Sequence, residues 1–507
     1  MATGLPKIGQ APVHYERRQP EKTDLYQLVQ NHIETFYAQV ETETEYGLPA
    51  YVKKEFDAFL DCGILANGFL RLRCGDCEHE KIVAFSCKKR GFCPSCGARR
   101  MAESAAHLVD NVIPKEPVRQ WVISFPIPLR ILFAAQPQLL TPALKVIHRA
   151  ISTFLIDVKG FTNAASAWMR RSGKQAGLKK KDASTGAVTL IQRFGSAANL
   201  NIHLHCLFLD GVYRMVDDKP LFQVVSPPSE DQLQKLLHQI MQRLMKSLTR
   251  QGFLTEEEGM IGLNETDDID PSLVPLHSAS CTYRIALGPR AGQKVLTLKT
   301  AEPQDWNIPS DRCVSHSGFS LHANTYCAPT NRGKLEKLCR YITRPALANE
   351  RVKVNRNGDV VLKLKSAYRD GTTHLVMTPL EFMQKLAALI PRPRLNLTRY
   401  HGVLAPNAKL RSQIIPQPPK DDTDEDGKDT EAVGCTGIRK QYMPWARLLK
   451  RVFGIDIETC PHCQGKLKII SAIEDPAIIA KILKHLGLPT RAPPRKPARY
   501  TDIYDSS

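Results

Sequence analysis

Apolar positions along the chain predict a protein in which strands and helices alternate. Short runs of β-branched and aromatic residues bounded by proline or glycine are typical of strands. Residues 120–125 (QWVISF) form such a run, which ends at Pro126, and residues 187–194 form another. Residues 202–209 (IHLHCLFL) are strongly apolar and are followed by Asp210 and a glycine. We therefore expect these three runs to be strands.

Apolar residues spaced three and four positions apart predict helices elsewhere in the chain. At residues 378–381 (TPLE), the sequence has an N-cap threonine, a proline at the first helical position and the glutamate of a capping box. Asn357-Gly358 is typical of a tight hairpin turn. The predicted helices cover residues 139–158, 229–247, 333–343 and 379–390, and the predicted hairpin covers residues 351–365.

The fold class that we predict is α+β, with small modules before and after a main domain. After residue 412 the chain becomes polar, with seven acidic residues between 421 and 431, as is typical of a disordered linker. The expected order is an N-terminal helical segment (1–60), a Cys-rich basic module (61–105), the main domain (115–412) with an insertion at about 213–300, an acidic disordered linker (413–435), a small C-terminal module (436–488) and a disordered tail (489–507).

The charge balance favours a polyanionic partner. The 507 residues include 70 Lys+Arg and 51 Asp+Glu, a formal net charge of +19. Such a surplus suits nucleic acid. The most apolar long segment, residues 121–147, is interrupted by prolines and an arginine, so we expect no membrane span. The N-terminus lacks the apolar core of a signal peptide, which favours an intracellular protein.

Clustered cysteines predict a structural zinc site. Six of the 14 cysteines lie between residues 62 and 96, and in a reducing compartment such clustering favours metal over disulfides. Two C-x2-C pairs are separated by 15 residues, which lies in the zinc-ribbon range, and zinc takes four thiolates in a tetrahedron. The predicted ligands are Cys74, Cys77, Cys93 and Cys96, with Cys62, Cys87 and His79 as alternatives.

A third C-x2-C pair, near the C-terminus, forms an incomplete motif. Cys460 and Cys463 would need two more ligands to hold zinc. The candidates are Cys435 and either His462 or His485.

His203-Leu204-His205 is a candidate site for a divalent ion. Side chains two positions apart in a strand point to the same face, so both imidazoles can reach one ion. A third ligand is needed, and Gln192 on the preceding strand is the best candidate by position, ahead of Asn199 and Asn201. The alternative is two ordinary half-buried histidines.

Tyr341, on the predicted helix 333–343, is a candidate nucleophile. An Mg²⁺ or Mn²⁺ ion on the histidines could polarise a phosphodiester as a Lewis acid. Arg340 and Arg344 flank the tyrosine, and their charge would hold a phosphate nearby and favour the phenolate form. The chain has 14 tyrosines, and packing against Leu338 is the alternative role.

Basic segments predict DNA contacts in two further places. Residues 71–103 carry eight Lys/Arg against four Asp/Glu, and phosphate contacts by such a module depend on salt. Residues 391–411 combine five Lys/Arg with Tyr400 and His401 and contain no acid, which suits single-stranded DNA, although a solvated loop is the alternative. His322 either lies near the histidine site or is structural. The predicted DNA contacts are Lys88, Lys89, Arg90, Arg99, Arg100, Arg340, Arg344 and Arg399.

Together and in this order, these pieces resemble the transposases of the insertion sequence 91 family, which includes the IS-common-region elements. The likeness runs from about residue 55 to 412 and returns over CPHCQGKLKIISAIEDP. The motifs that carry it after the Cys-rich module are QWVISFPIPLR, GAVTLIQRFGSAANLNIHLHCLFLDGVY, LEKLCRYITRPALANERV and RYHGVLAPNAKLR.

The resemblance implies an HUH-type endonuclease, in which a central antiparallel sheet carries His203 and His205 and a helix carries the tyrosine. The implied reaction is attack by the Tyr341 hydroxyl on one DNA strand, which gives a 5′-phosphotyrosine link and a free 3′-OH. Because the link conserves the bond energy, no nucleotide cofactor is needed. The element would move by a rolling-circle route through single-stranded DNA.

This chain resembles the single-tyrosine branch of that family. Some members carry two tyrosines four residues apart, whereas Lys337 stands four residues before Tyr341 here. A second strand transfer would then need a second protomer or reuse of Tyr341, so an oligomer remains an open expectation.

Two other functions remain open from the residues alone. One is a zinc-dependent DNA-binding protein without catalysis, and the other is a metal-dependent phosphodiesterase that uses water. The expected cofactors are zinc and Mg²⁺ or Mn²⁺. The expected partner is DNA, chiefly single-stranded element ends, without a membrane, and the expected location is the cytoplasm, in association with the nucleoid.

Overall fold

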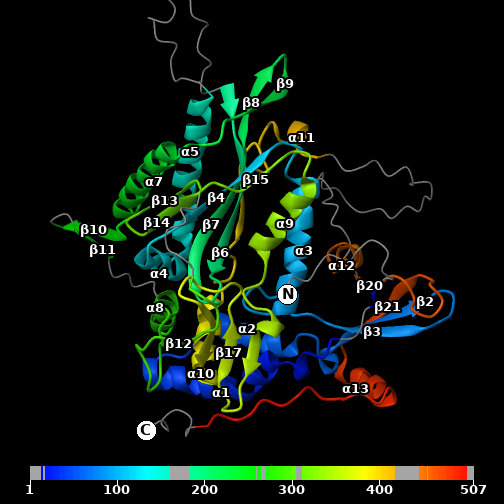
Figure 1. Cartoon of the computed structure of the whole chain (residues 1–507). Coiled ribbons are helices and arrows are strands. Elements are labelled where there is room, and N and C mark those ends of the chain that lie inside the picture. Colours follow the sequence, from blue (N-terminus) through cyan, green and yellow to red (C-terminus); the bar gives the residue numbers. More distant parts are fainter. Residues whose placement is uncertain are drawn as a thin grey trace, which may run out of the picture.

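An antiparallel sheet of seven strands forms the centre of the structure (Figure 1). The computed structural model describes residues 13–14, 18–159, 182–257, 260–263, 270–303, 311–416, 445–453 and 455–499. The strand order is β13-β14-β4-β7-β6-β19, and the short β15 also pairs with β4. The bounds are β4 Val118–Ser124, β6 Gly186–Phe194, β7 Leu200–Leu209, β13 Cys313–His316, β14 Phe319–His322, β15 Tyr326–Cys327 and β19 Thr398–Gly402.

Helices cover both faces of this sheet, which explains why β6 and β7 are buried along nearly their whole length. Leu204, Cys206 and Phe208 pack into one core cluster, whereas Leu207 and Leu209 pack into another. Successive side chains of a strand point to opposite faces. One face is covered by α4 (Ile127–Ala135), α5 (Leu140–Val158) and α7 (Glu230–Arg250), and the other by α3 (Pro94–Asn111) and α9 (Arg332–Thr343) (Figure 1).

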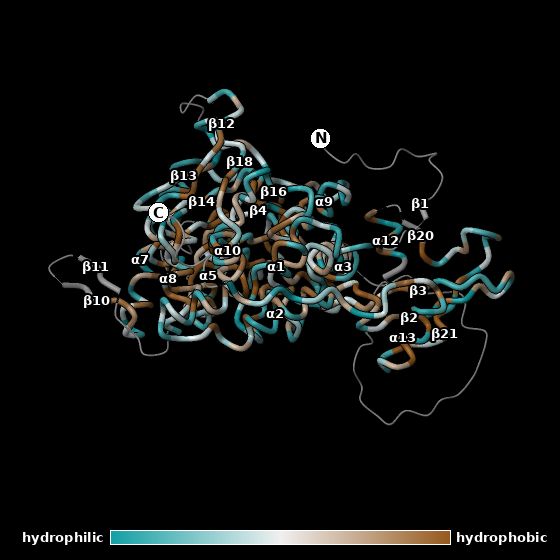
Figure 2. The backbone as a smooth tube through the Cα atoms, turned by 90° about the horizontal axis from the view of Figure 1, so that it is seen from below, coloured by the Kyte–Doolittle hydropathy of each residue, from teal (hydrophilic) through white to brown (hydrophobic). Residues whose placement is uncertain are grey.

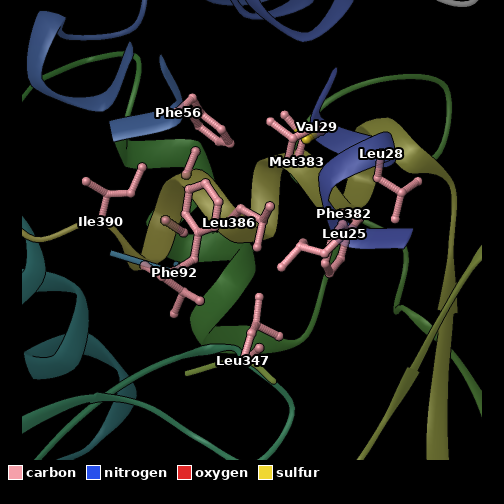
Figure 3. Packing of buried hydrophobic residues seen from close by; sticks show 14 of the residues in the cluster. Leu25, Leu28, Val29, Phe56, Phe92, Leu347, Phe382, Met383, Leu386 and Ile390 are labelled. Carbon is pink, nitrogen blue, oxygen red and sulfur yellow. The ribbon is translucent and has the colours of Figure 1, made fainter. Parts of the chain in front are cut away.

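The N-terminal helices belong to a second core rather than to a separate segment. They pack with α10, which is buried on all sides because it lies between them and a four-stranded sheet of order β12-β18-β17-β16. Figure 3 shows Leu25 close to Phe382, and Phe56 farther along the same core, beyond Leu386. The elements are α1 Asp24–Thr44, α2 Ala50–Asp61, β12 Leu296–Lys299, β16 Val352–Val354, β17 Val360–Lys363, β18 Thr372–Met377 and α10 Pro379–Leu389.

The predicted insertion at 213–300 is only partly an insertion. Its first part forms a hairpin that pairs with β5 and then the long helix α7, which begins at the capping box of Ser229. Its last part is built into the second core, since Leu276 of α8 is buried there and β12 pairs with β18. The remaining elements are β5 Ala183–Ser184, β8 Gly211–Val216, β9 Lys219–Val224, β10 Leu254–Glu257, β11 Met260–Leu263 and α8 Val274–Thr282.

The Cys-rich module and the C-terminal module share one small sheet of order β21-β2-β3 (Figure 2). Its strands come from opposite ends of the chain, and α13 packs its Ile479 and Leu483 against Leu65 and Phe69. The elements are η2 Leu65–Asn67, β2 Phe69–Cys74, β3 Glu80–Ala84, α12 Trp445–Phe453, β21 Leu467–Ile473 and α13 Pro476–His485; β1 Val13–His14 also pairs in parallel with β20 Ile455–Asp456.

The predicted strands and helices of the main domain are confirmed with small shifts of their ends. The hairpin turns at Gly358, whose φ of 87° favours glycine, and the Thr378 capping box starts α10. The prediction of a disordered tail is wrong for its described part. Residues 489–499 run along α1 because Arg495 pairs with Glu34 and Asp57. The predicted linker lies mostly outside the described residues.

One helical stretch, Pro137–Val158, is long and apolar enough to cross a membrane. Its apolar residues, including Leu144, Ile147 and Ile151, are buried in the core of the main domain. It is therefore a core helix that packs against α7 and the central sheet.

A buried ion pair joins β4 to the end of β7, and we expect its loss to destabilise the fold. Arg119 donates to both carboxylate oxygens of Asp210 at 2.9 and 2.7 Å, and both side chains are under 5% exposed. Asp210→Ala would leave a buried unpaired guanidinium, so the free energy of unfolding should fall by about 3–5 kcal/mol. Urea unfolding followed by circular dichroism measures this.

The matched control is Asp231→Ala, which removes the exposed pair with Lys235 on α7. Its effect should stay within about 0.5 kcal/mol. Equal effects of the two substitutions would contradict the structural role of Asp210.

Candidate active site

His203 and His205 lie on the face of the sheet that α3 and α9 cover. They share this face with Leu207 and Leu209, because residues two apart on β7 point the same way. Gln192 of β6 is directly opposite His203 in the strand register. Directly opposed residues share a face. The amide of Gln192 and the two imidazoles, whose ring centroids are 4.8 Å apart, therefore form one polar row on an otherwise apolar face.

In both His203 and His205 the protein bonds to Nδ1, so the Nε2 atoms are available to bind a ligand. His203 Nδ1 lies 2.8 Å from the carbonyl oxygen of Asn201. A carbonyl oxygen only accepts, so Nδ1 carries the proton and Nε2 keeps a lone pair. His205 Nδ1 lies 2.6 Å from the amide nitrogen Nε2 of Gln120 on β4. When the amide of Gln120 is turned by 180°, its oxygen accepts from Nδ1–H in the same way, and Nε2 of His205 then keeps its lone pair. His205 Nε2 is buried and has no hydrogen-bond partner among the described residues.

Both histidines are neutral at pH 7. Burial, together with the charges of His203 and Arg344, lowers the pKa of His205 to about 3. Burial also lowers the pKa of His203, against a raising effect of the Asn201 carbonyl. The neutral imidazole is the form that binds a metal ion.

Tyr341 lies on α9, over this same face of the sheet. Leu335, Cys339 and Ile342 are the buried side of the helix, and the Tyr341 side chain at its edge is 47% exposed. The Gln192 Nε2 donates to the backbone oxygen of Ile342 at 2.7 Å. This bond joins the polar row on β6 and β7 to the residue that follows Tyr341.

Two cations lie over the Tyr341 ring. Lys365 Nζ is 3.8 Å and Arg344 Cζ is 4.8 Å from the ring centroid. Arg344 also lies close enough to His203 and His205 for its charge to lower the pKa of each. The tyrosine and the histidine pair thus have one guanidinium as a common neighbour. Partial burial, together with Arg344 and Arg351, lowers the pKa of Lys365 to about 8.

A cavity of about 120 Å³ adjoins Gln192 and Arg344. Water needs about 10–15 Å³ on this measure, so the cavity admits a much larger group. Its lining includes no acid, and five cations belong to it. Such a lining favours an anion. The cations that line it are Lys89, Arg90, Arg100, Arg193 and Arg344.

Four cysteines meet where α2 ends and α3 begins, next to this cavity. Their sulfur atoms lie within 4.8 Å of one another. Cys93 is the residue before the first turn of α3, and Cys96 lies in that turn. The Sγ–Sγ distances include 3.3 Å for Cys87–Cys96 and 3.7 Å for Cys62–Cys96. We call this group the α3 cluster, and its members are Cys62, Cys87, Cys93 and Cys96.

Four other cysteines meet between the β2–β3 turn and the turn before β21. Their sulfur atoms also lie within 4.8 Å of one another. Cys74 Sγ is 3.4 Å from Cys463 Sγ, and Cys77 Sγ is 3.5 Å from Cys460 Sγ. We call this group the C-terminal cluster, and its members are Cys74, Cys77, Cys460 and Cys463.

Comparison with known protein families decides what kind of protein carries these features. Residues 28–125 match the family model of the IS91 "Transposase zinc-binding domain", and residues 186–412 match a family model described as "Putative transposase". The chain belongs to the IS91 family of transposases. No curated protein and no solved structure matches it. The match and the clustered cysteines support structural zinc in this transposase.

The polar row of the transposase fits a divalent ion. The buried Nε2 of His205 is a ligand atom to which no residue in the described part of the chain bonds. His203 offers its own Nε2 as a second ligand atom. The amide oxygen of Gln192 is available as a third, because the amide nitrogen is the atom that bonds to Ile342. Imidazole nitrogen with amide oxygen suits first-row metal ions, and Mn²⁺ more than Mg²⁺.

The prediction of one zinc site on Cys74, Cys77, Cys93 and Cys96 is corrected by the structure. The two C-x2-C turns lie in different clusters, and each pairs with cysteines from elsewhere. Cys74 ends β2, whose neighbour β21 brings Cys460 and Cys463 beside it, whereas Cys93 starts α3 next to the end of α2. The rings of His79 and His462 contact each other, tilted by 42°, and neither histidine belongs to the C-terminal cluster. Cys435 lies outside the described residues.

The predicted DNA-binding residues divide into those near the site and those with other contacts. Arg344 lies at Tyr341. Arg100 donates to the backbone oxygens of Lys88 and Lys89, and so braces the cysteine loop. Arg399 of β19 is opposite Thr189, on the α5 face of the sheet and so away from the histidines. The others are Arg90, which bonds to Leu395, Arg99, which pairs with Glu103, and Arg340 on α9.

Sequence reasoning missed Gln120 and Lys365. Gln120 stands at the start of the motif QWVISF, and only the register of β4 against β7 shows that it reaches His205. Lys365 follows the β16–β17 hairpin, and no local sequence pattern marks it as a site residue. His322 of β14 is opposite Val122, which is opposite His205, so it lies on the histidine face two strands away.

Gln120 holds the His205 ring, and we expect its loss to weaken metal binding. Outer partners of metal-binding histidines are typically worth about 10–100-fold in affinity. Gln120→Ala should therefore weaken Mn²⁺ binding by about that factor, measured by titration with electron paramagnetic resonance. Gln242→Ala, an exposed position on α7, is the matched control and should leave binding unchanged. An unchanged affinity in Gln120→Ala would contradict the role.

Proposed function

We propose that this transposase nicks and rejoins single-stranded DNA at element ends through a covalent 5′-phosphotyrosine at Tyr341, as a step of rolling-circle-like transposition. The observation that carries the proposal is the hydrogen bond from Gln192 to Ile342. This bond joins α9, the tyrosine helix that carries Tyr341, to the polar row on β6 and β7. The common neighbour Arg344 supports it independently.

The reaction needs a nucleophile, a held phosphate and a leaving group. The Tyr341 oxygen attacks the scissile phosphorus, and the bond from phosphorus to the 3′ oxygen breaks. The phenol proton is lost to solvent or a base, and the leaving oxygen takes up a proton, which gives a free 3′-OH. A 3′-OH that attacks the phosphotyrosine reverses the step and rejoins a strand. No net bond energy is lost, so no nucleotide is consumed.

Different residues would stabilise the negative charge and hold the metal ion. Arg344 and Lys365 would stabilise negative charge on the phenol oxygen and on the phosphate. The neutral imidazoles of His203 and His205 and the amide oxygen of Gln192 would hold Mg²⁺ or Mn²⁺. When bound, that ion supplies Lewis-acid polarisation of the phosphodiester.

The basic cavity supports a path for single-stranded DNA beside the site. Its cations come from the Cys-rich loop, from β6 and from the end of α9, so a phosphate there would touch all three. Phe194 lines the same cavity and offers an aromatic face to a base. Double-stranded DNA would need its strands separated to reach so narrow a space.

We infer that the α3 cluster holds the structural zinc of the matched domain. Its four ligands all lie inside residues 28–125. The first turn of α3 then presses on the end of the tyrosine helix, since a Cβ on Gly97 would lie 2.5 Å from Cβ of Pro345. Zinc would thus fix the position of α3 and, through it, of Arg344 and Tyr341.

Transposase function implies a cytoplasmic protein, and association with the nucleoid is part of the proposal. A single nucleophile at Tyr341 would require a second protomer or two rounds of attack for complete transfer. Mass photometry of the protein on DNA would separate these two arrangements.

Tyr341→Phe should abolish the covalent adduct. Single-stranded oligonucleotides that tile the DNA flanking the coding sequence, labelled at the 3′ end, are incubated with the protein and Mg²⁺ or Mn²⁺. The 3′ label stays with the fragment that becomes joined to Tyr341, so a denaturing gel should show a labelled protein band. In Tyr341→Phe that band should fall to background.

Tyr326→Phe is the matched control, because Tyr326 is also exposed and has Arg119 over its ring at 5.4 Å. It should form the adduct normally. Cleavage that survives in Tyr341→Phe would show a phosphodiesterase that uses water, and a band shift without cleavage would show a binding protein. Either result overturns the proposal.

Lys365→Met should slow adduct formation. A cation over an aromatic ring is worth about 0.5–2 kcal/mol, so the rate at pH 7 should fall by about 2- to 30-fold, while Lys365→Arg keeps most of it. Because the pKa of Lys365 is lowered to about 8, its charge is lost above that pH. The ratio of the wild-type rate to the Lys365→Met rate should therefore approach one as the pH rises.

Lys363→Met, at an exposed position on β17, is the control and should leave the rate unchanged. Single-turnover gels at several pH values give these rates. A ratio that does not change between pH 7 and pH 9 would contradict the role of the Lys365 charge.

A further inference from the structure

The C-terminal cluster is a second complete set of four thiols, which the matched zinc-binding domain does not contain. Cys460 and Cys463 lie more than 300 residues after residue 125, where that match ends. They approach Cys74 and Cys77 across 389 and 383 residues of chain. The α3 cluster already supplies four ligands within the match, so this second set is left without a function there.

The distances in the C-terminal cluster fit a metal ion and exclude a disulfide. A tetrahedron with Zn–S bonds of about 2.3 Å has edges of about 3.8 Å. In this cluster the Cys74–Cys463 and Cys77–Cys460 sulfur pairs lie at 3.4 and 3.5 Å, and all four sulfurs lie within 4.8 Å of one another. A disulfide needs about 2.05 Å, so none of the four cysteines is bonded to another.

The backbone around the cluster holds two turns face to face. Each C-x2-C turn adjoins a strand of one sheet, because β2 ends at Cys74 and β21 begins just after Cys463. The two turns can approach each other because residue 465 is a glycine. A Cβ on Gly465 would lie 3.0 Å from Cys74 Sγ and still closer to the Asp76 carboxylate. Backbone bonds from Gly75 to Lys466 and from Cys460 to Gly465 fix the turns.

We propose that Cys74, Cys77, Cys460 and Cys463 bind a second structural zinc ion, which fastens the C-terminal module to the Cys-rich module. Four thiolates complete the coordination of zinc and leave no open position, as in other structural sites. The ion would close a loop of nearly four hundred residues, so both ends of the chain are held at one point.

The C-terminal module also contacts α9, the helix that carries Tyr341. Arg451 of α12 donates to Asp110 of α3 at 2.5 Å and to Glu336 of α9 at 2.8 Å. After α13, the tail returns to α1 and α2 through the Arg495 pairs with Glu34 and Asp57. Release of the second zinc should therefore loosen β21 and α13 first, and then remove a support from α9.

The first test counts zinc in the full-length protein, purified without a polyhistidine tag, by inductively coupled plasma mass spectrometry. We expect two zinc ions per chain. The double variant Cys460→Ser with Cys463→Ser should hold one, and Cys313→Ser, a cysteine outside both clusters, should hold two. One zinc in the wild type, or two in the double variant, overturns the proposal.

The second test needs no variant, so misfolding cannot affect it. Cys77 and Cys463 are exposed and should react rapidly with iodoacetamide as free thiols. In the zinc-loaded wild type, both should be protected at least tenfold relative to protein stripped with a chelator, as measured by peptide mass spectrometry. Equal alkylation rates with and without chelator overturn the proposal. Neither test depends on the DNA reaction, so failure of one proposal is distinguishable from failure of the other.

Discussion

A single side-chain amide connects the two halves of the candidate active site. Gln192 is opposite His203 in the sheet and donates to the backbone of Ile342, beside Tyr341. Strand β6 can place this amide only because its register against β7 is fixed by apolar residues on both faces. A shift by one residue would turn the histidines toward α5, into a core with no room for a charged ligand.

The position of the tyrosine helix depends on elements from three parts of the chain. Helix α3 packs along α9, and its N-cap Cys93 and first-turn Cys96 belong to the α3 cluster. Arg451 bonds both helices from the C-terminal side, and Gln192 bonds α9 from the sheet. Tyr341 itself stays about half exposed. The proposed nucleophile therefore lies on a well-supported helix, and its own side chain remains accessible.

The cations near Tyr341 are positioned by the same packing. Arg344 follows the end of α9 and is half-buried, and burial lowers its pKa. Its Nη1 has no hydrogen-bond partner within the described part of the chain. An unpartnered guanidinium beside two neutral imidazoles is costly in the free protein. That cost falls when a phosphate arrives, so the site is organised for an anion in advance.

The sequence by itself determined the strands, the helices and the His203-Leu204-His205 face, because these follow from spacing within ten or twenty residues. It also identified Gln192 and Tyr341 as candidates. Only the tertiary structure decided which cysteines meet, since eight thiols have many groupings and Cys460 reaches Cys77 through a strand pairing that no local pattern encodes. It likewise placed Gln120 and Lys365 at the site and Arg399 on the far face, because those positions depend on register and on helix docking between distant segments.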